Sequence, residues 1–322
     1  MKIRNLAGFI IALAVLVVGF PACNEKKKEI TDNKVSFGII TDVHQDLQPD
    51  ARERLQAFID SAKVVNPDFI VQLGDLSHGT TTDSILEIWN RYPGKNYHVL
   101  GNHDSDNLPK DSIIKKQNMP GRYYSYDIGG MHFIVLDLNY FIQKGEHIDF
   151  GLGNNYPIPS DSKNLISPPQ MLWLEEDLAS TGKPTIVFSH QGIGDTFPDW
   201  VSPSNKKIRE IFAKANSGGE KKVIACFAGD QHVDTYEEIE GVHYFQINSA
   251  SYFWIEESAV FSNGHMAEYK DPLFAFVTVD LNNRTIEVKG VNSVFLEPAP
   301  SSENYSTPQK LSASVTSRKV NF

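Results

Sequence analysis

Short apolar runs alternate with amphipathic segments near the start of this chain, and this alternation restricts the fold more than any other feature. The runs VSFGIIT at 35–41, PDFIVQL at 67–73 and YHVL at 97–100 are typical of buried strands. Between them, segments 52–65 and 84–92 carry apolar residues at helical spacing. Such an order of strands and helices requires a mostly parallel sheet with helices packed on its faces. The sequence therefore predicts an α/β domain.

The rest of the chain extends this domain and then changes in composition. Residues 123–137 contain two apolar runs joined by Gly129-Gly130, which is typical of a β-hairpin. Further alternation predicts helices at 170–180 and 204–215 and strands at 184–190, 223–229, 242–248, 273–280 and 285–290. We expect one domain over 35–292. The remaining residues, 293–322, are rich in Ser, Pro and Thr and are expected to form a tail or wrapping arm.

The N-terminus has the features of a targeting segment. An apolar run at 6–20 follows two basic residues and is shorter than the ~20 residues that a membrane-spanning helix needs. Cys23 comes next, and the segment resembles a bacterial lipoprotein signal, in which cleavage before the cysteine leaves that residue to be lipidated. We therefore expect a signal peptide at 1–22, a lipidated tether at 23–34 and a mature domain at the cell envelope, outside the cytoplasm and anchored to a membrane. An ordinary cleaved signal or a short membrane anchor is the alternative.

The composition argues against a nucleic-acid-binding surface and against a structural disulfide. The formal net charge of -10 argues against a surface for nucleic acid, because phosphate backbones are held by clustered Lys and Arg. A small anionic substrate remains compatible with this charge where local cations overcome the long-range field. The only cysteine besides Cys23 is Cys226, which lies in the apolar run 223–229 and has no plausible disulfide partner. We expect it to be a buried thiol.

Polar blocks follow five of the predicted strands, at the point where each strand ends. Their histidines, carboxylates and amide are Asp42, His44, Asp75, Asn102, His103, Asp104, His190, Asp230 and His232. Because the carboxyl ends of parallel strands meet at one edge of a sheet, these side chains are expected to share one pocket. In the pairs Asp42-x-His44 and Asp230-x-His232, strand alternation would put both side chains on the same side. Oxygen and imidazole donors without thiolates suit Mn, Fe or Zn rather than a structural zinc site.

The ordered motifs DxH, GD, GNHD, a strand-terminal histidine and a final GxxH resemble those of the calcineurin-like metallophosphoesterases. This family includes purple acid phosphatases, cyclic-nucleotide phosphodiesterases and ADP-ribose or CDP-alcohol diphosphatases. The resemblance covers residues 35–290 and implies a four-layer α/β/β/α sandwich of two mixed sheets. It also implies an enzyme that hydrolyses a small phosphomonoester, phosphodiester or nucleotide pyrophosphate. A hydroxide held between two divalent ions would attack the phosphorus, because the ions lower the pKa of bound water to about 7.

Residue by residue, the resemblance implies two metal sites and one acid. One ion would be held by Asp42, His44 and His232, and the second by Asn102, His190 and Asp230. Asp75 would bridge both ions, and His103 would stand beside the substrate, where it protonates the leaving oxygen. Asp104 would fix the tautomer of His103. Gly101 would let the backbone turn sharply before these residues.

Position 230 departs from the family pattern, which usually has histidine there. The carboxylate of Asp230 can still bind a hard cation, and its charge would favour Mn or Fe over Zn. It could equally mark a weakened second site. The alternative to an enzyme is therefore a non-catalytic binding lipoprotein that keeps the scaffold and has lost one metal at Asp230.

Three other features have two interpretations each. His78, in GDLSHG, could contact substrate phosphate, but we expect a loop histidine without a metal role. The long aromatic and Gly-rich insertion at 139–159 could form a lid over a base or sugar, or it could pack over the scaffold. Tyr252, Phe253 and Trp254 have the same two interpretations.

Overall fold

The computed structural model describes residues 33–196, 201–219, 221–254, 266–297, 299–300 and 311–322. The chain divides into two units, 1–32 and 33–322, and all of the described residues belong to the second. The predicted signal peptide at 1–22, the lipidation at Cys23 and most of the tether therefore lie outside the described residues. In the part of the chain that is described, no helix is long and apolar enough to cross a membrane.

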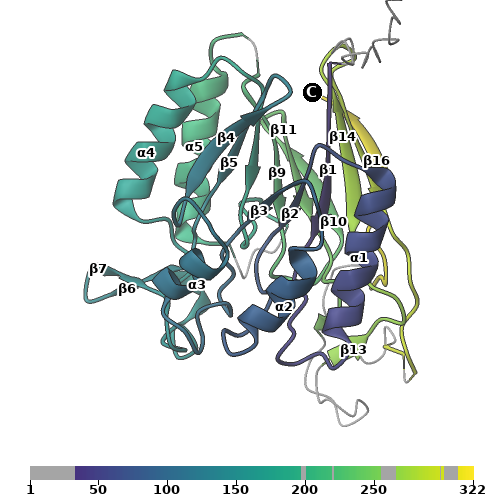
Figure 1. Ribbon diagram of the computed structural model, residues 1–322. Coiled ribbons are helices and arrows are strands. Elements are labelled where there is room, and N and C mark those ends of the chain that lie inside the picture. The colour runs from purple at the N-terminus through teal and green to yellow at the C-terminus, as the bar shows by residue number, and fades with distance from the viewer. Residues whose placement is uncertain (1–32, 197–200, 220, 255–265, 298, 301–310) are drawn as a thin grey trace, which may run out of the picture. The chain divides into compact units, whose positions relative to one another are not determined.

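The first of two six-stranded mixed sheets is built around the predicted opening of alternating strands and helices (Figure 1). Its strands are β1 (Lys34–Ile40), β2 (Phe69–Gln72), β3 (Lys95–His98), β14 (Ala275–Asp280), β15 (Thr285–Gly290) and β16 (Arg318–Asn321), in the order β16-β15-β14-β1-β2-β3. β1, β2 and β3 are parallel, with Phe37 opposite Phe69 and Phe69 opposite Lys95. The other three strands are antiparallel to their neighbours and extend the sheet on the far side of β1. The carboxyl ends of β1, β2 and β3 therefore meet at one edge.

The second sheet has the order β10-β11-β9-β8-β5-β4. Its strands are β4 (Tyr124–Ile128), β5 (Met131–Val135), β8 (Thr185–Phe188), β9 (Val223–Ala228), β10 (Thr235–Ile239) and β11 (Val242–Gln246). β5, β8, β9 and β11 are parallel, while β4 and β10 pair antiparallel at the two edges. β4 and β5 form the hairpin that the Gly129-Gly130 turn predicts. Because β8 and β9 are parallel neighbours, the residues that follow them also lie at one edge.

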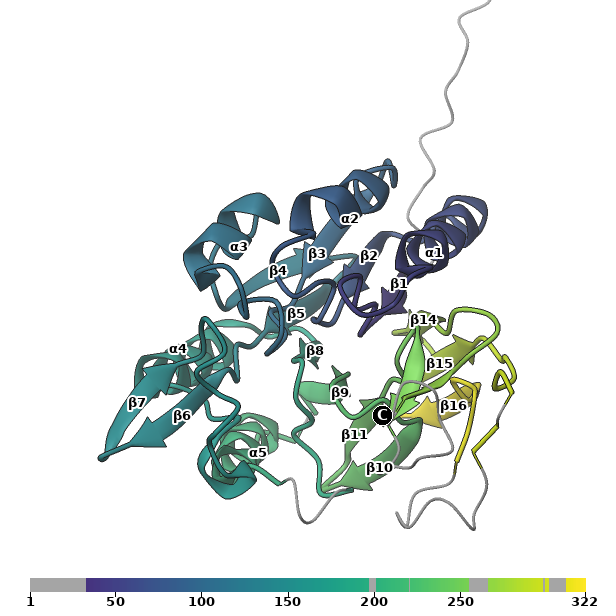
Figure 2. The ribbon, with the colours of Figure 1, turned by 90° about the horizontal axis from the view of Figure 1, so that it is seen from below.

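Helices cover the outer face of each sheet, which gives four layers (Figure 2). The helices are α1 (Ala51–Val65), α2 (Thr82–Trp89), α3 (Lys110–Lys116), α4 (Pro168–Ser180) and α5 (Pro203–Asn216). Phe58 of α1 packs in one apolar cluster with Ile70 of β2. Leu174 of α4 packs in another with Val187 of β8, and Cys226 is buried in the same cluster, as the sequence predicts.

An aromatic core fills the space between the two sheets. Phe37 stacks on Phe69 with 5.1 Å between ring centroids and meets Phe188 edge-on at 5.5 Å. Alternation along β1 explains this, because Phe37 and Ile39 point to the other sheet while Ile40 faces helices α1 and α2. Both faces of the sheet are thus buried, which is why its strands are continuous apolar runs in the sequence. The predicted four-layer α/β/β/α sandwich is confirmed.

Several smaller elements were not predicted from the sequence. They are α3, β6 (Tyr140–Gln143), β7 (Glu146–Asp149), a 3-10 helix (Ser160–Ser162), β10, β12 (Tyr252–Trp254) and β13 (Met266–Glu268). β6 and β7 form a hairpin within the insertion at 139–159. Within the predicted arm at 293–322, β16 returns to the first sheet and pairs with β15. Its sequence, RKVN, is short and mostly polar, so it carries no apolar run that would indicate a strand.

Candidate metal centre

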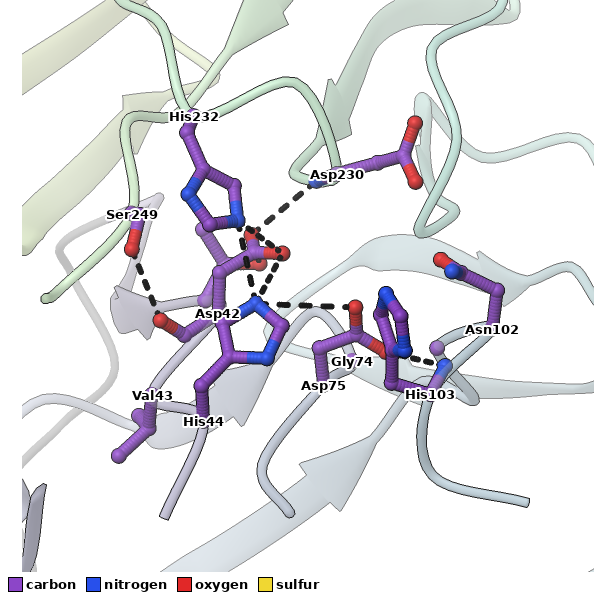
Figure 3. Close-up of polar contacts among 12 residues, drawn as sticks. Asp42, Val43, His44, Gly74, Asp75, Asn102, His103, Asp230, His232 and Ser249 are labelled. Atoms are coloured by element: carbon purple, nitrogen blue, oxygen red, sulfur yellow. Dashed lines mark hydrogen bonds and ion pairs between the residues drawn. The ribbon is translucent and has the colours of Figure 1, made fainter. Parts of the chain in front are cut away.

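The predicted site residues lie in the loops that follow β1, β2, β3, β8 and β9, at the edge where the parallel strands end. Side chains far apart in sequence come together there (Figure 3). Asp42 follows β1 and Asp230 follows β9, yet the Asp230 N–H donates a hydrogen bond to Asp42 Oδ2 at 3.1 Å. The two sheets therefore contribute to one site.

Asp42, His44 and His232 form the first donor cluster, and each is at most 1% exposed. The Nε2 atoms of His44 and His232 lie 3.1 Å apart. Asp42 Oδ1 is 3.3 Å from His232 Nε2 and 3.7 Å from His44 Nε2. That oxygen is buried and has no hydrogen-bond partner among the described residues. Three donor atoms that face one point in a buried site are arranged for a shared cation.

Asn102, His190 and Asp75 form a second cluster beside the first. His190 Nε2 is 3.0 Å from Asn102 Oδ1 and 3.2 Å from Asp75 Oδ2. The same Asp75 oxygen is 3.8 Å from His44 Nε2 of the first cluster. Burial alone would raise the pKa of Asp75, but the nearby His190 and His103 lower it below its usual range. An ionised carboxylate therefore lies between the two clusters, where a bridging ligand would stand.

Hydrogen bonds on the far side of the rings direct two imidazole nitrogens toward the clusters. His190 Nδ1 donates to the Leu73 carbonyl at 2.7 Å. His232 Nδ1 donates to the Tyr252 carbonyl at 2.9 Å. A carbonyl oxygen can only accept, so each Nδ1 carries a proton and each Nε2 faces the donor clusters.

The charge states of these groups suit divalent cations. Burial lowers the pKa of His44 to about 4, so this ring is neutral and can offer a lone pair to a cation. Burial also opposes a charge on His190, but the carboxylates of Asp75 and Asp42 outweigh it and raise the pKa of His190. In the protein alone that ring holds a second proton, on Nε2, which an arriving cation would displace. Ionised carboxylates, an amide oxygen and imidazoles together fit a pair of divalent metal ions.

The backbone that carries these donors is strained. Asp42, His44, Asp75, Asp230 and His232 all have positive φ, between 51° and 70°. Residues other than glycine rarely adopt this left-handed region, and each one costs roughly 1–3 kcal/mol. Strand alternation, which the sequence predicts for the Asp42-x-His44 pair, does not apply there, because β1 ends before both residues. Left-handed turns, rather than strand alternation, put the two side chains on the same side.

Gly101 is needed for a different reason from the one that the sequence suggests. It is not among the glycines with positive φ, so a sharp turn does not explain it. A Cβ at this position would collide with the Asp75 carboxylate. Gly74 does have a positive φ, of 109°, and a Cβ there would lie 2.7 Å from Gly101 Cα. The two glycines let the loops after β2 and β3 approach closely beside Asp75.

Residues 35–234 match the profile of the calcineurin-like phosphoesterase family. The chain belongs to this family. As a calcineurin-like phosphoesterase it is a metal-dependent hydrolase, and the two donor clusters are its candidate metal sites. The match favours the enzyme over the non-catalytic alternative.

Individual relatives of this phosphoesterase agree with the family match. A manganese-dependent ADP-ribose/CDP-alcohol diphosphatase from Oryza sativa subsp. japonica is 24% identical over 295 residues, covering 74% of this chain and 89% of that protein. A solved dimetal phosphatase from Danio rerio superposes with a TM-score of 0.59 at 15% identity, covering 81% of this chain and 98% of that one. GAP50, the anchor in the inner membrane complex of Plasmodium, superposes with a TM-score of 0.52 at 15% identity, covering 89% of each chain. The two structures show a shared fold.

In this calcineurin-like phosphoesterase the partner of the His103 ring is Asp106 and not Asp104. His103 Nδ1 lies 2.8 Å from Asp106 Oδ2. The Asp104 carboxylate instead accepts hydrogen bonds from the backbone N–H groups of Asp75, at 3.1 Å, and Gly101, at 2.8 Å. The prediction that Asp104 fixes the tautomer of His103 is therefore wrong, since Asp104 joins the loops after β2 and β3. Burial opposes a charge on His103, but Asp75 and Asp106 raise its pKa to about 9.

Asp230 lies at the outer side of the second cluster. Its Oδ1 is 3.5 Å from His190 Nε2, and its Oδ2 accepts a hydrogen bond from Gln231 Nε2 at 2.6 Å. Figure 3 shows its carboxylate on the side of Asn102, away from His232. Burial raises the pKa of Asp230, so a nearby cation would stabilise its ionised form. Ligation by Asp230 stays a prediction.

Two contacts at the site were not predicted from the sequence: that of His78, for which we expected a loop position without a metal role, with the His44 ring, and that of Tyr156 with the His103 ring. His78 Nε2 lies 3.0 Å from His44 Nδ1, and the His78 ring stacks on the His103 ring with 4.6 Å between centroids. His78 is thus the outer partner of a donor-cluster histidine, a role that its loop position does not indicate. The Tyr156 hydroxyl, from the insertion, lies 2.7 Å from His103 Nδ1.

The aromatic run from Tyr252 to Trp254 lies beside the first cluster. Tyr252 and Phe253 are fully buried, so packing is the correct interpretation for these two residues. The Trp254 ring is partly exposed and lies 5.4 Å from the His232 ring.

Proposed function

We propose that this phosphoesterase hydrolyses a small phosphorylated substrate of the nucleotide pyrophosphate class at the two donor clusters. The observation that carries the proposal is the position of Asp75, whose Oδ2 lies 3.2 Å from His190 Nε2 and 3.8 Å from His44 Nε2. One carboxylate between two clusters suits a two-metal site, in which both ions contact the reacting phosphate. The relative from Oryza sativa, a manganese-dependent ADP-ribose/CDP-alcohol diphosphatase, supports both manganese and this substrate class.

The donor clusters would bind the metal ions in such a reaction, and His103 would donate a proton. Two divalent ions held here would lower the pKa of a water molecule and offset the negative charge on the phosphoryl oxygens. Asp42 and Asp75 balance the charge of the ions, while Asn102 adds a neutral oxygen. His103 Nδ1 is occupied by Asp106, which leaves Nε2 to donate a proton to the oxygen of the leaving group.

A substrate screen with the purified protein and Mn²⁺ tests the proposal. We expect kcat/KM for ADP-ribose to exceed that for nitrophenyl phosphate and for its bis-ester by about 10-fold or more. The reason is that a nucleotide offers more groups whose binding energy can be used in the transition state. A preference for either nitrophenyl ester would reject the substrate class. If none of the three is hydrolysed while two ions are bound, the function itself is rejected.

Asp230→Ala is expected to weaken binding of the second ion by about 10-fold or more, with activity partly recovered at high Mn²⁺. The substitution removes a carboxylate oxygen that lies 3.5 Å from His190 Nε2. A manganese titration followed by both metal content and rate measures the effect.

Asp230→His is the matched control for this prediction. It restores the donor that the family usually has, and it should shift the metal preference toward Zn while keeping hydrolysis. If Asp230→Ala binds manganese with the affinity of the parent protein and hydrolyses substrate at the same rate, Asp230 is not a ligand. The second ion would then depend on Asn102, His190 and Asp75 alone.

A further inference from the structure

The insertion at 139–159 is fastened to the loop that follows β3. The Leu152 N–H donates to the Ser105 carbonyl at 2.8 Å. At the base of the insertion, the Lys110 ammonium bonds the Asp149 carboxylate at the end of β7. Lys110 is only 4% exposed, so this charge-assisted bond is shielded from water. The insertion is therefore docked beside the site by contacts of its own.

Tyr156 extends from this insertion to His103. Its hydroxyl lies 2.7 Å from His103 Nδ1 and 2.5 Å from Asp106 Oδ2. The Tyr156 ring is tilted by 46° against the His103 ring, with 5.7 Å between centroids. Tyr156 is 57% exposed, so core packing does not dictate its position. The two hydrogen bonds of its hydroxyl are what fix it.

One arrangement of protons satisfies all of these contacts. Burial and the Asp106 carboxylate raise the pKa of Tyr156, so the phenol keeps its proton and donates it to Asp106. His103 Nδ1–H then donates to Asp106 and to the phenol oxygen. With Nδ1 protonated and held, the free end of the imidazole is Nε2.

We propose that Tyr156 is a positioning residue that holds Asp106 and the imidazole of His103, so that Nε2 faces the leaving group. The inference rests on the proposed role of His103 as the proton donor. His78, His103 and Asp106 could alternatively bind a third ion. However, the 2.8 Å between His103 Nδ1 and Asp106 Oδ2 is the length of a direct hydrogen bond, and Tyr156 supplies a second donor, so this network needs no ion.

Tyr156→Phe tests the proposal because it removes only the hydroxyl. We expect kcat to fall by roughly 10-fold or more for a phenyl phosphate ester, since a misplaced acid loses much of its effect. The loss should be smaller for the matching nitrophenyl ester, whose leaving oxygen is more acidic and needs less help from a proton donor. KM, manganese content and melting temperature should stay at the parent values, because the ring remains and the donor clusters are unchanged.

Tyr140→Phe is the matched control. Tyr140 lies on β6 of the same insertion, and its hydroxyl contacts Arg122 at 3.4 Å rather than His103. It should lose less rate than Tyr156→Phe and show no difference between the two esters. Equal losses in the two variants would indicate a merely structural role and overturn the proposal. A loss in Tyr156→Phe that is the same for both esters would overturn it too.

Nitrogen NMR of the imidazoles separates this inference from the proposed function. The chemical shift of His103 Nδ1 reports its hydrogen bond even in a protein that hydrolyses none of the substrates. The chemical shift of His103 Nδ1 should differ from that of the parent protein in Tyr156→Phe and equal it in Tyr140→Phe. An unchanged signal in Tyr156→Phe would overturn the inference, whereas an inactive parent with a moved signal would overturn only the proposed function.

Discussion

Asp75→Asn is expected to abolish hydrolysis and to reduce the amount of bound metal. Asn has nearly the same shape and tolerates the positive φ of 54° at this position, so the change removes charge without adding strain. Asp75 is 2% exposed and lies within 3.8 Å of an imidazole nitrogen in each cluster. A loss of several kcal/mol of charge stabilisation corresponds to about 10³-fold or more in rate. Rate and metal content measured on one preparation check the result.

Asp137→Asn is the matched control, because it removes a buried carboxylate that lies outside the donor clusters. Asp137 is 0% exposed, and it accepts a hydrogen bond from the Lys110 ammonium at 3.0 Å, outside the donor clusters. Its substitution should lower the melting temperature and leave the ions bound, because the buried Lys110 ammonium loses one of its two carboxylate partners and the donor clusters are unchanged. Full activity with two ions bound in Asp75→Asn would reject the bridging position.

The strand order explains why the grouping of the donors could be predicted from the sequence. Parallel strands of one sheet end at one edge, and the corresponding edges of the two sheets lie together, so polar residues after β1 of the first sheet and β9 of the second meet although 188 positions separate Asp42 from Asp230. Apolar periodicity is sufficient to locate those strand ends. Long-range proximity therefore follows from a local pattern, provided that the strands are parallel.

Features that depend on the course of a loop could not be predicted in this way. Asp104 and Asp106 are both acidic and lie two residues apart. A turn in which the Asp106 N–H donates to the His103 carbonyl at 3.0 Å decides which of them reaches the imidazole. The positive φ of Asp42 and His44 likewise belongs to a loop without periodicity. None of these features alters the hydrophobic pattern from which the elements were predicted.

The contact between Tyr156 and His103 could not be predicted from the sequence either. Tyr156 lies 53 positions from His103, and its place depends on how the insertion docks on the Ser105 carbonyl. Docking of an insertion leaves no periodic pattern in the sequence. One tyrosine among several aromatic residues of the insertion could therefore not be singled out.

His103→Ala is expected to keep the ions and to lower kcat by roughly 100-fold or more. Alanine retains the backbone N–H that donates to Asp75 Oδ1 at 2.8 Å, so the proposed bridging carboxylate is not disturbed. The loss should be larger for the phenyl ester than for the nitrophenyl ester, because a poorly acidic leaving group depends most on a proton from Nε2. Steady-state rates with both esters and metal analysis of the same samples measure the effect.

Metal content decides between two roles for this imidazole. His103 clusters with His78 and Asp106 in an arrangement that could itself bind an ion. If His103→Ala loses metal together with rate, the imidazole is a ligand, and the division into donor clusters and a separate acid is wrong. If the metal is kept, free imidazole can be added to occupy the space that the side chain leaves. Rescue that is greater for the phenyl ester than for the nitrophenyl ester then identifies proton transfer to the leaving oxygen as the step that His103 serves.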